Sequence, residues 1–145
     1  MFYFMILRKI KYNGGNHMKA LLVKPKCKPE VINLKDTLED WYKYIGRPVE
    51  FIYPFSDLVA IICNEEGKLN GMPYNRPLFK NYNEVYDIIA GNFLIVGIKP
   101  PNEDDGKICG LSDKLIEKYS EYFKQCYEYF MYANTLHIIP YDSIE

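Results

Sequence analysis

In the first third of the chain, the pattern of hydrophobic and polar positions predicts two short strands and one helix. Residues 19–24 and 31–34 are rich in Leu, Val and Ile and flank a proline-bounded turn, which predicts a hairpin. Apolar residues then recur at helical spacing. Thr37, three residues before Asp40, predicts the start of this helix, and Gly46 predicts its end.

Three apolar runs in the middle of the chain predict further strands. Residues 49–55 read as a strand broken at Pro54, and the uninterrupted apolar run 59–62 is typical of a strand buried on both faces. Residues 86–98 form a third and longer run. Gly91-Asn92 divides this run, and the sequence is compatible either with a hairpin turn there or with a glycine kink in one long strand.

The C-terminal third predicts a long helix. A loop rich in proline, glycine and acidic residues precedes Ser112, which is a favourable N-cap residue. Apolar side chains then recur at helical spacing, namely Leu115, Ile116, Tyr119, Phe123, Cys126, Tyr127 and Phe130. Residues 137–141 predict a last short strand. The pattern as a whole predicts an α+β fold, with a small mainly antiparallel sheet packed with a short helix and one long C-terminal helix.

Residues 1–17 are expected to be an upstream extension rather than part of the fold. Their basic residues follow the apolar ones, which reverses the order found in a signal peptide. Gly14-Gly15 can be encoded by codons that contain a bacterial ribosome-binding sequence at a suitable distance from Met18. We therefore predict that Met18 is the natural start and that residues 18–145 form a single α+β domain.

Composition narrows the classes of function. The 145 residues carry a net charge of −1, and three of the 18 basic residues precede Met18, whereas no acidic residue does. This balance argues against direct nucleic-acid binding, which needs a basic surface. The four cysteines are dispersed, and no apolar stretch reaches the length of a membrane span. We expect a protein of a reducing cytoplasm with no metal site, no cofactor and no membrane contact.

The segment 64–76 holds the candidate site. Its Asn-Glu-Glu-Gly and Asn-Gly sequences supply turn chemistry, and Asn75-Arg76 adds groups suited to planar hydrogen bonding. Arg76 is expected to hold a phosphate or a carboxylate, and nearby tyrosines to stack on a ring. The predicted ligand-binding residues are Asn64, Glu65, Asn70, Tyr74, Asn75 and Arg76, together with Tyr53 and Tyr86. The same segment is also compatible with a simple turn, in which Arg76 pairs with Asp87 across strands.

The sequence resembles an uncharacterised family, a domain of unknown function. The resemblance rests on the segments KALLVKP, VINLKDTLED, NEEGKLNGMPYNR and YDIIAGNFLIVG, and it covers about residues 18–97. Members of that family occur in phages and conjugative elements of Gram-positive bacteria, and many begin with Met-Lys-Ala, as residues 18–20 do here. The resemblance implies an accessory gene of a mobile element and a place in the cytoplasm of the bacterial host, and it carries no established activity.

Three classes of function remain, and we expect the first. It is a non-catalytic protein that binds a small polar ligand, for example a nucleotide that the host uses as a defence signal. The second is an inhibitor of a host protein, acting through a face around Tyr119, Tyr122 and Tyr129. The third is a small nucleotide-processing enzyme that depends on Glu65. A homodimer is compatible with any of the three.

The sequence predicts no catalytic residue. Glu65 and Glu66 are neighbours on a turn, so their carboxylates are expected to point in different directions. Cys63 and His137 have the chemistry of a thiolate–imidazole pair, but nothing in the sequence brings them together. Cys63 lies within an apolar run, where a cysteine is typically a small buried hydrophobic residue.

Overall fold

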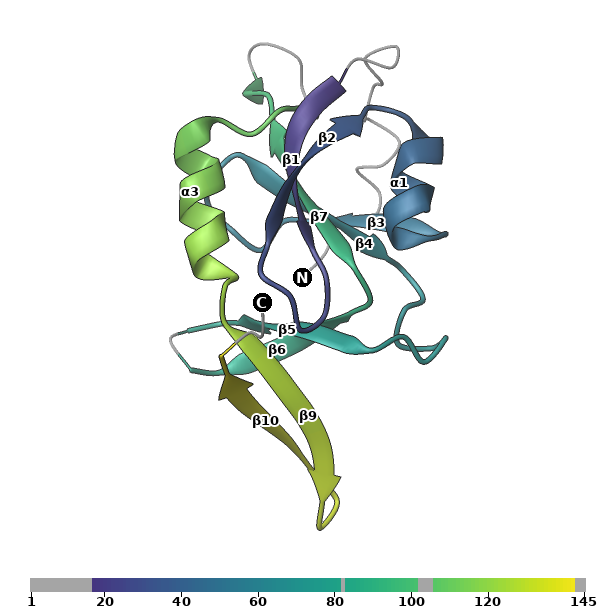
Figure 1. Ribbon diagram of the computed structural model, residues 1–145, viewed down its shortest axis with the longest axis vertical. Coiled ribbons are helices and arrows are strands. Elements are labelled where there is room, and N and C mark those ends of the chain that lie inside the picture. The colour runs from purple at the N-terminus through teal and green to yellow at the C-terminus, as the bar shows by residue number, and fades with distance from the viewer. Residues whose placement is uncertain (1–16, 82, 102–105, 143–145) are drawn as a thin grey trace.

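Figure 1 shows the computed structural model, which describes residues 17–81, 83–101 and 106–142. The predicted upstream extension lies outside the described residues, apart from His17. In the described part of the chain, a central antiparallel sheet has the strand order β2-β1-β7-β4-β3, and β8 pairs with β7. Its strands are β1 (His17–Val23), β2 (Glu30–Lys35), β3 (Val49–Ile52), β4 (Val59–Asn64), β7 (Phe93–Ile98) and β8 (Ile108–Cys109).

The first hairpin and the first helix form as predicted. β1 and β2 pair antiparallel. Helix α1 (Leu38–Ile45) follows, and the Thr37 hydroxyl at its start accepts a hydrogen bond from the Asp40 backbone N–H at 3.2 Å. Gly46 ends the helix with a φ of +74°, a conformation that glycine adopts without strain. Local capping signals therefore set both ends of α1.

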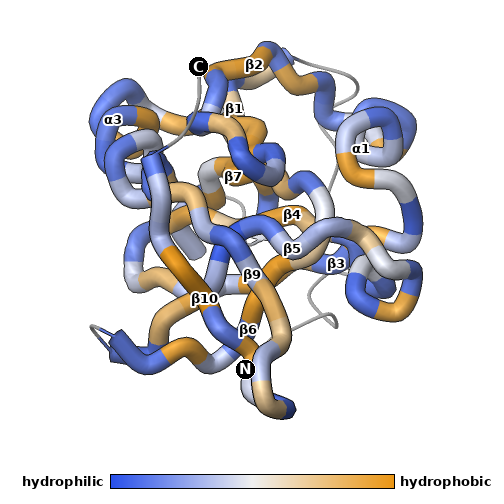
Figure 2. The backbone as a smooth tube through the Cα atoms, turned by 60° about the horizontal axis from the view of Figure 1, so that its bottom comes forward, coloured by the Kyte–Doolittle hydropathy of each residue, from blue (hydrophilic) through white to orange (hydrophobic). Residues whose placement is uncertain are grey.

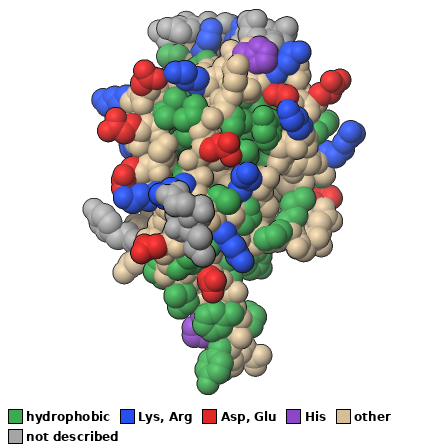
Figure 3. Space-filling model, viewed as in Figure 1, with side chains coloured by type: hydrophobic (Ala, Val, Ile, Leu, Met, Phe, Trp, Pro, Cys, Tyr) green, Lys and Arg blue, Asp and Glu red, His purple; other side chains and the backbone are tan. Residues whose placement is uncertain are grey.

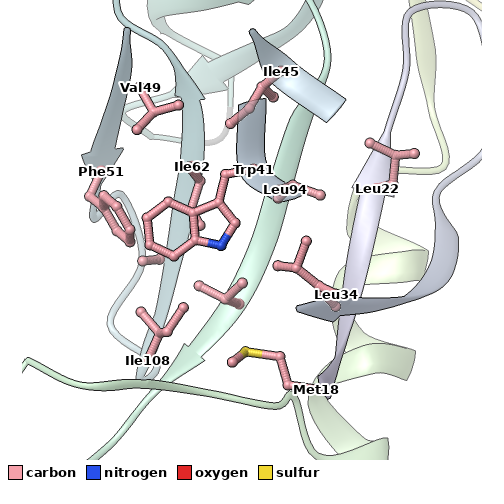
Figure 4. Close-up of a cluster of buried hydrophobic side chains, with 13 residues drawn as sticks. Met18, Leu22, Leu34, Trp41, Ile45, Val49, Phe51, Ile62, Leu94 and Ile108 are labelled. Carbon is pink, nitrogen blue, oxygen red and sulfur yellow. The ribbon is translucent and has the colours of Figure 1, made fainter. Parts of the chain in front are cut away.

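Both faces of the central sheet are buried, as the uninterrupted apolar run in β4 predicts. On one face, α1 packs over the sheet and the Trp41 ring meets the Phe51 ring edge-on, with centroids 5.3 Å apart (Figure 4). The alternate side chains point to the other face, where they pack against helix α3 (Asp113–Tyr122) and a second sheet. Examples on this second face are Leu21, Ile61, Phe93 and Ile95. The sheet is thus the middle layer of three.

The second sheet consists of β5 (Tyr74–Phe79) and β6 (Val85–Ala90), which pair antiparallel. β6 and β7 belong to different sheets, so the chain crosses from one layer to the other between them. Both structures predicted for Gly91-Asn92 are therefore wrong, because this segment is neither a hairpin turn nor a kink in one strand. Gly91 makes the crossing with a φ of +83°.

The predicted long C-terminal helix is also wrong. α3 has only ten residues, and a hairpin of β9 (Cys126–Tyr132) and β10 (Thr135–Tyr141) follows it. Ala133 and Asn134 form the two-residue turn with φ values of +51° and +63°, as a type I′ turn requires. The last predicted strand is part of β10. Among the described residues, strands hold 47% and helices 16%, so the fold is mainly β rather than α+β.

The long helix is wrongly predicted because apolar residues keep a helical spacing on both sides of the real end of α3. Up to Phe123 the helical spacing is real, because Tyr119 and Phe123 are both buried against the central sheet. Beyond it, tyrosines, phenylalanines and isoleucines dominate, and these residues favour strands. The apolar positions after Phe123 continue the helical interval without belonging to the helix.

The β9–β10 hairpin, residues 126–141, projects from the body (Figure 1), and we call it the arm. In Figure 2 the arm comes toward the viewer. At its root the Tyr129 hydroxyl donates a hydrogen bond to the Asn75 backbone carbonyl at 2.8 Å. The Tyr74 and Tyr129 rings also meet edge-on, with centroids 5.3 Å apart. The arm is therefore anchored to β5.

Candidate functional site

Asn75 lies within β5 and is buried, with 1% of its surface exposed. Its side-chain nitrogen donates to the backbone carbonyls of Val23, at 3.0 Å, and Gly91, at 2.9 Å. The amide therefore joins β5 to the end of β1 and to the crossing between the sheets. Such contacts satisfy polar groups that would otherwise be buried without a partner.

Arg76, the next residue, is equally buried and gathers carbonyl groups from distant segments. Its Nε donates to the Phe123 carbonyl at 2.9 Å, and Nη2 donates to the Cys27 carbonyl at 2.6 Å. Its Nη1 donates to the Lys24 carbonyl at 3.4 Å and to the Asn75 side-chain oxygen at 2.8 Å. Phe123 is the C-cap of α3, where a positive charge also interacts favourably with the helix dipole.

The charge of Arg76 has no carboxylate partner among the described residues. Burial lowers the pKa of the guanidinium, but an arginine stays protonated in proteins. The four hydrogen bonds use four of its five N–H donors, which leaves one N–H without a bond to a described residue. A buried cation with this donor to spare favours an anion beside it.

A cavity of about 550 Å³ lies beside Arg76, and we call it the arginine cavity. One wall comes from β5 and the residues after it, and the other comes from the end of α3 and the start of the arm. The lining residues are Arg76, Pro77, Phe79, Lys80, Asn81, Tyr122, Phe123, Gln125 and Tyr127. Two cations and four aromatic rings therefore face one space, which is a combination suited to an anionic ligand that carries a ring.

The two tyrosines of the cavity are neutral hydrogen-bonding groups at ordinary pH. Burial raises the pKa of Tyr122, and Tyr127 adds to this effect. Burial also raises the pKa of Tyr127, against a smaller opposing effect of the Arg76 charge. Both phenols keep their protons, so both can donate to a ligand oxygen.

Sequence reasoning missed most of this cavity. Lys80 and Gln125 belong to no sequence motif, and the sequence predicts Tyr122 on an interaction face. The sequence predicts Tyr127 on the long C-terminal helix, whereas it lies on β9. Only Arg76 was in the predicted site. The cavity wall at the start of the arm depends on the β9–β10 hairpin, where the sequence predicts a helix.

The other predicted polar residues are not at this cavity. Asn64 is buried at the end of β4, where its Nδ2 donates to the Ile45 carbonyl at 3.1 Å and its Oδ1 accepts from the Glu66 backbone N–H at 2.8 Å. Glu65 is exposed and lines a separate cavity of about 350 Å³ with Asn64. Asn70 is an exposed residue of the following turn. The Asn64 side chain therefore holds the start of the turn, whereas a ligand-binding role for Glu65 and Asn70 stays a prediction.

The predicted aromatic wall is not formed by Tyr53 and Tyr74. Tyr53 packs against the core on the α1 face, and burial raises its pKa to about 12. Tyr74 lies on β5, on the opposite side of the central sheet, and lines a third cavity of about 440 Å³ beside the arm. Tyr86 is partly exposed on β6, and burial raises its pKa.

The alternative cross-strand pair of Arg76 and Asp87 is also wrong. Arg76 lies opposite Ile89 in the β5–β6 register, and Asp87 accepts a hydrogen bond from the Lys68 ammonium group. The guanidinium therefore points to backbone carbonyls rather than to an acid of the neighbouring strand.

The structure does not support a catalytic cysteine. Cys63 is buried in β4, with its Sγ 4.0 Å from a Glu50 oxygen. Burial and the Glu50 charge raise the pKa of the thiol, so it stays protonated and unreactive. His137 lies on the arm, stacked on Phe130. Among the described residues, no group of three or more His, Cys, Asp and Glu side chains is placed to hold a metal ion.

The tyrosines of the predicted interaction face do not form one exposed surface. Tyr119 is buried, and its hydroxyl donates to the Asp57 carboxylate at 2.7 Å. Tyr129 is half-buried at the root of the arm, whereas Tyr122 lines the arginine cavity. An interaction through these three side chains together is therefore not supported.

Fold and cavity define a small, mainly β protein in which a buried arginine lies beside an aromatic cavity. The chain belongs to the family described as Domain of unknown function (DUF3846), whose model matches residues 18–124. The predicted resemblance to an uncharacterised family is confirmed to this extent. Comparison with curated proteins and with solved structures gives no match. In the described part of the chain, no helix has the length and apolar character needed to cross a membrane.

Proposed function

We propose that this protein is a non-catalytic binder of a small anionic ligand that carries an aromatic ring, such as a nucleotide, in the arginine cavity. The observation that carries the proposal is the buried Arg76 guanidinium, which has no carboxylate partner among the described residues and retains one unused N–H donor. A ligand phosphate or carboxylate supplies the missing negative charge.

The surrounding side chains give the ligand its remaining contacts. Lys80 is exposed at the rim and adds a second positive charge for the anionic group. Tyr122 and Tyr127 offer ring faces for stacking and phenol donors for hydrogen bonds. A purely electrostatic site would need no such rings, so their presence favours a ligand with a base or another aromatic group.

Binding without turnover fits the chemistry of the lining. The nine described residues that line the cavity include no Asp, Glu, His or Cys. The cavity therefore lacks the side chains that most often act as general base or covalent nucleophile. The resemblance to proteins of phages and conjugative elements extends the proposal to a role, namely the sequestration of a nucleotide defence signal in the cytoplasm of the bacterial host.

The experiment is native mass spectrometry of the full chain after exposure to extract of a Gram-positive bacterium, followed by heat release of the bound molecule. We expect an unchanged anionic aromatic molecule, and we expect Lys80→Glu and Tyr127→Leu each to reduce its retention at least tenfold. Lys114→Ala is the matched control, because Lys114 is an exposed lysine at the opposite end of α3.

Either of two results would overturn the proposal. A protein that retains no small molecule would exclude ligand binding under these conditions. A released molecule that is chemically altered would instead establish an enzyme.

A further inference from the structure

The two walls of the arginine cavity differ in charge. Both of its cations, Arg76 and Lys80, come from β5 and the residue after it. The facing wall, which we call the arm wall, is formed by the end of α3 and the start of the arm. Its described residues are all uncharged, namely Tyr122, Phe123, Gln125 and Tyr127. Figure 3 likewise shows hydrophobic side chains gathered on the arm and charged ones spread over the body. An anionic group is therefore held at β5, while the ring of the same ligand lies against the arm wall.

Gln125 is the amide of the arm wall, and its orientation is fixed. Its Nε2 donates a hydrogen bond to the Tyr141 backbone carbonyl at 2.7 Å and another to the Cys126 backbone carbonyl at 3.1 Å. An amide oxygen in the place of Nε2 would face two acceptors, so the assignment of nitrogen and oxygen is settled by the neighbours. Both amide hydrogens are used, and they join the start of β9 to the end of β10.

The oxygen of the same amide is open to a ligand. Oε1 accepts no hydrogen bond from a described residue, and it is not one of the described side-chain atoms that are buried without a partner. It is therefore accessible. Tyr141 lines a neighbouring cavity of about 280 Å³ and not the arginine cavity, whereas Gln125 lines both. The nitrogen end of the amide points to the side of Tyr141, so the oxygen end points toward the arginine cavity.

This oxygen differs from the other polar groups around the ligand space. The two cations of the cavity only donate hydrogen bonds, and the two tyrosine hydroxyls either donate or accept. Asn81 is exposed, and either end of its amide can turn toward a ligand. Among the described residues of the lining, Gln125 alone is therefore fixed as an acceptor.

We propose that the ring of the ligand carries an exocyclic amino group, as adenine and cytosine do, and that Gln125 Oε1 accepts a hydrogen bond from it. The inference rests on the proposed function and adds to it the chemical class of the ring and the residue that recognises it. A ring without a donor would cover this oxygen and leave it unpaired. The ring N–H of a keto base such as uracil lies between two carbonyl oxygens, which would approach the same acceptor.

The test is isothermal titration calorimetry of the full chain with two matched pairs of nucleotides. Adenosine 5′-monophosphate and purine riboside 5′-monophosphate differ only in the amino group. Cytidine 5′-monophosphate and uridine 5′-monophosphate differ in that a carbonyl oxygen replaces the amino group. We expect the aminated member of at least one pair to bind, with an affinity at least about tenfold higher than that of its counterpart, because a site with a fixed acceptor rejects a ligand that lacks the donor.

Gln125→Lys separates recognition from support of the arm. The lysine ammonium group can still donate to the carbonyls of Tyr141 and Cys126, but it has no acceptor. The preference for the aminated nucleotide should fall to within about twofold, even where the added charge tightens the binding of both members. A purely structural role of Gln125 would instead weaken both members equally and leave their ratio unchanged. Asn33→Lys is the matched control, because it adds the same charge at an exposed position on β2 and should preserve the ratio.

Three results would overturn the inference. Equal affinity for the two members of each pair would exclude recognition of the amino group and leave the proposed function standing. A preference that survives Gln125→Lys would assign the recognition to another residue. A chain that binds neither aminated nucleotide would also contradict the inference, and the heat-release experiment would then show separately whether another anionic aromatic molecule is bound.

Discussion

Arg76 donates a hydrogen bond from Nη1 to the side-chain oxygen of Asn75, its neighbour on β5, at 2.8 Å. Consecutive strand residues normally point to opposite faces, yet this pair forms one buried polar unit. The β5–β6 register shifts between Tyr74 and Arg76, which is a local irregularity that re-aims side chains. The pair thereby joins three otherwise separate parts of the body, namely the end of β1, the end of α3 and the crossing between the sheets.

Arg76→Lys should lower the free energy of unfolding by about 2–4 kcal/mol, because a single ammonium group cannot reach carbonyls that the guanidinium fork spans. The carbonyls of Phe123 and Cys27 would lose their donor. Urea unfolding measures the change. Arg47→Lys is the control, since Arg47 is exposed and contacts only the face of Tyr42 among the described rings. Equal losses in the two variants would contradict a structural role of the Arg76 fork.

Gly67→Ala should be more destabilising than Gly71→Ala. A Cβ on Gly67 would lie 2.7 Å from the Ala90 backbone carbonyl oxygen, so the backbone would have to shift, at a cost of about 2–3 kcal/mol. Gly71 has a φ of +71° but no atom within 4 Å of its added Cβ. Gly71→Ala should therefore lower the free energy of unfolding by only about 1 kcal/mol, because of backbone strain. Thermal unfolding of the two variants tests this order, and a reversed order would refute it.

Asp57→Asn should lower the free energy of unfolding at neutral pH. It should also make that free energy less dependent on pH in the acidic range. Hydrogen bonds from Lys118 and Tyr119 lower the pKa of the Asp57 carboxyl from its ordinary value of 3.8. A lowered pKa means that the ionised group stabilises the fold above about pH 4 and that this contribution is lost as the pH falls through the folded-state pKa. Urea unfolding from neutral to acidic pH checks the profile. Tyr119→Phe removes one of the two donors and should give an intermediate profile.

Glu50→Gln should raise stability at neutral pH. Burial, with added repulsion from Glu65 and Asp87, raises the pKa of the Glu50 carboxyl. A raised pKa means that the ionised form costs stability, and this cost disappears as acid protonates the group. The advantage of the variant should therefore be present at pH 7 and lost in acid, when followed by thermal unfolding. Glu117→Gln, at an exposed position on α3, is the control and should show no such advantage.

How much of the fold could be predicted depended on how local its signals were. The β1–β2 hairpin, the capped helix α1 and the buried strand β4 follow from patterns within a few residues, and these predictions are confirmed. The C-terminal helix failed because the apolar interval continues past the real helix end without a glycine or proline to stop it. Ala133-Asn134 is a weak turn signal compared with Asn-Gly, so the hairpin also stayed hidden.

Only part of the candidate site could likewise be predicted from local signals in the sequence. Arg76 is predicted as a ligand group from its chemistry, but no strand is predicted over residues 74–79, where the structure has β5. Its burial could not be predicted, because the groups that satisfy it come from residues about fifty positions away in the sequence. Lys80 and Tyr127 line the same cavity because α3 is shorter than predicted and the arm packs against β5.

The sequence by itself determined the local elements, namely the apolar strands of the central sheet, the helix caps and the scarcity of charge in residues 129–141. Capping, alternation and helical spacing are decided by neighbours along the chain, and so they can be read from it. Only the tertiary structure decided which face each element covers, where the arginine cavity forms and which side of the arm stays exposed. These features depend on hydrogen bonds and packing between distant segments, which no short stretch of sequence specifies.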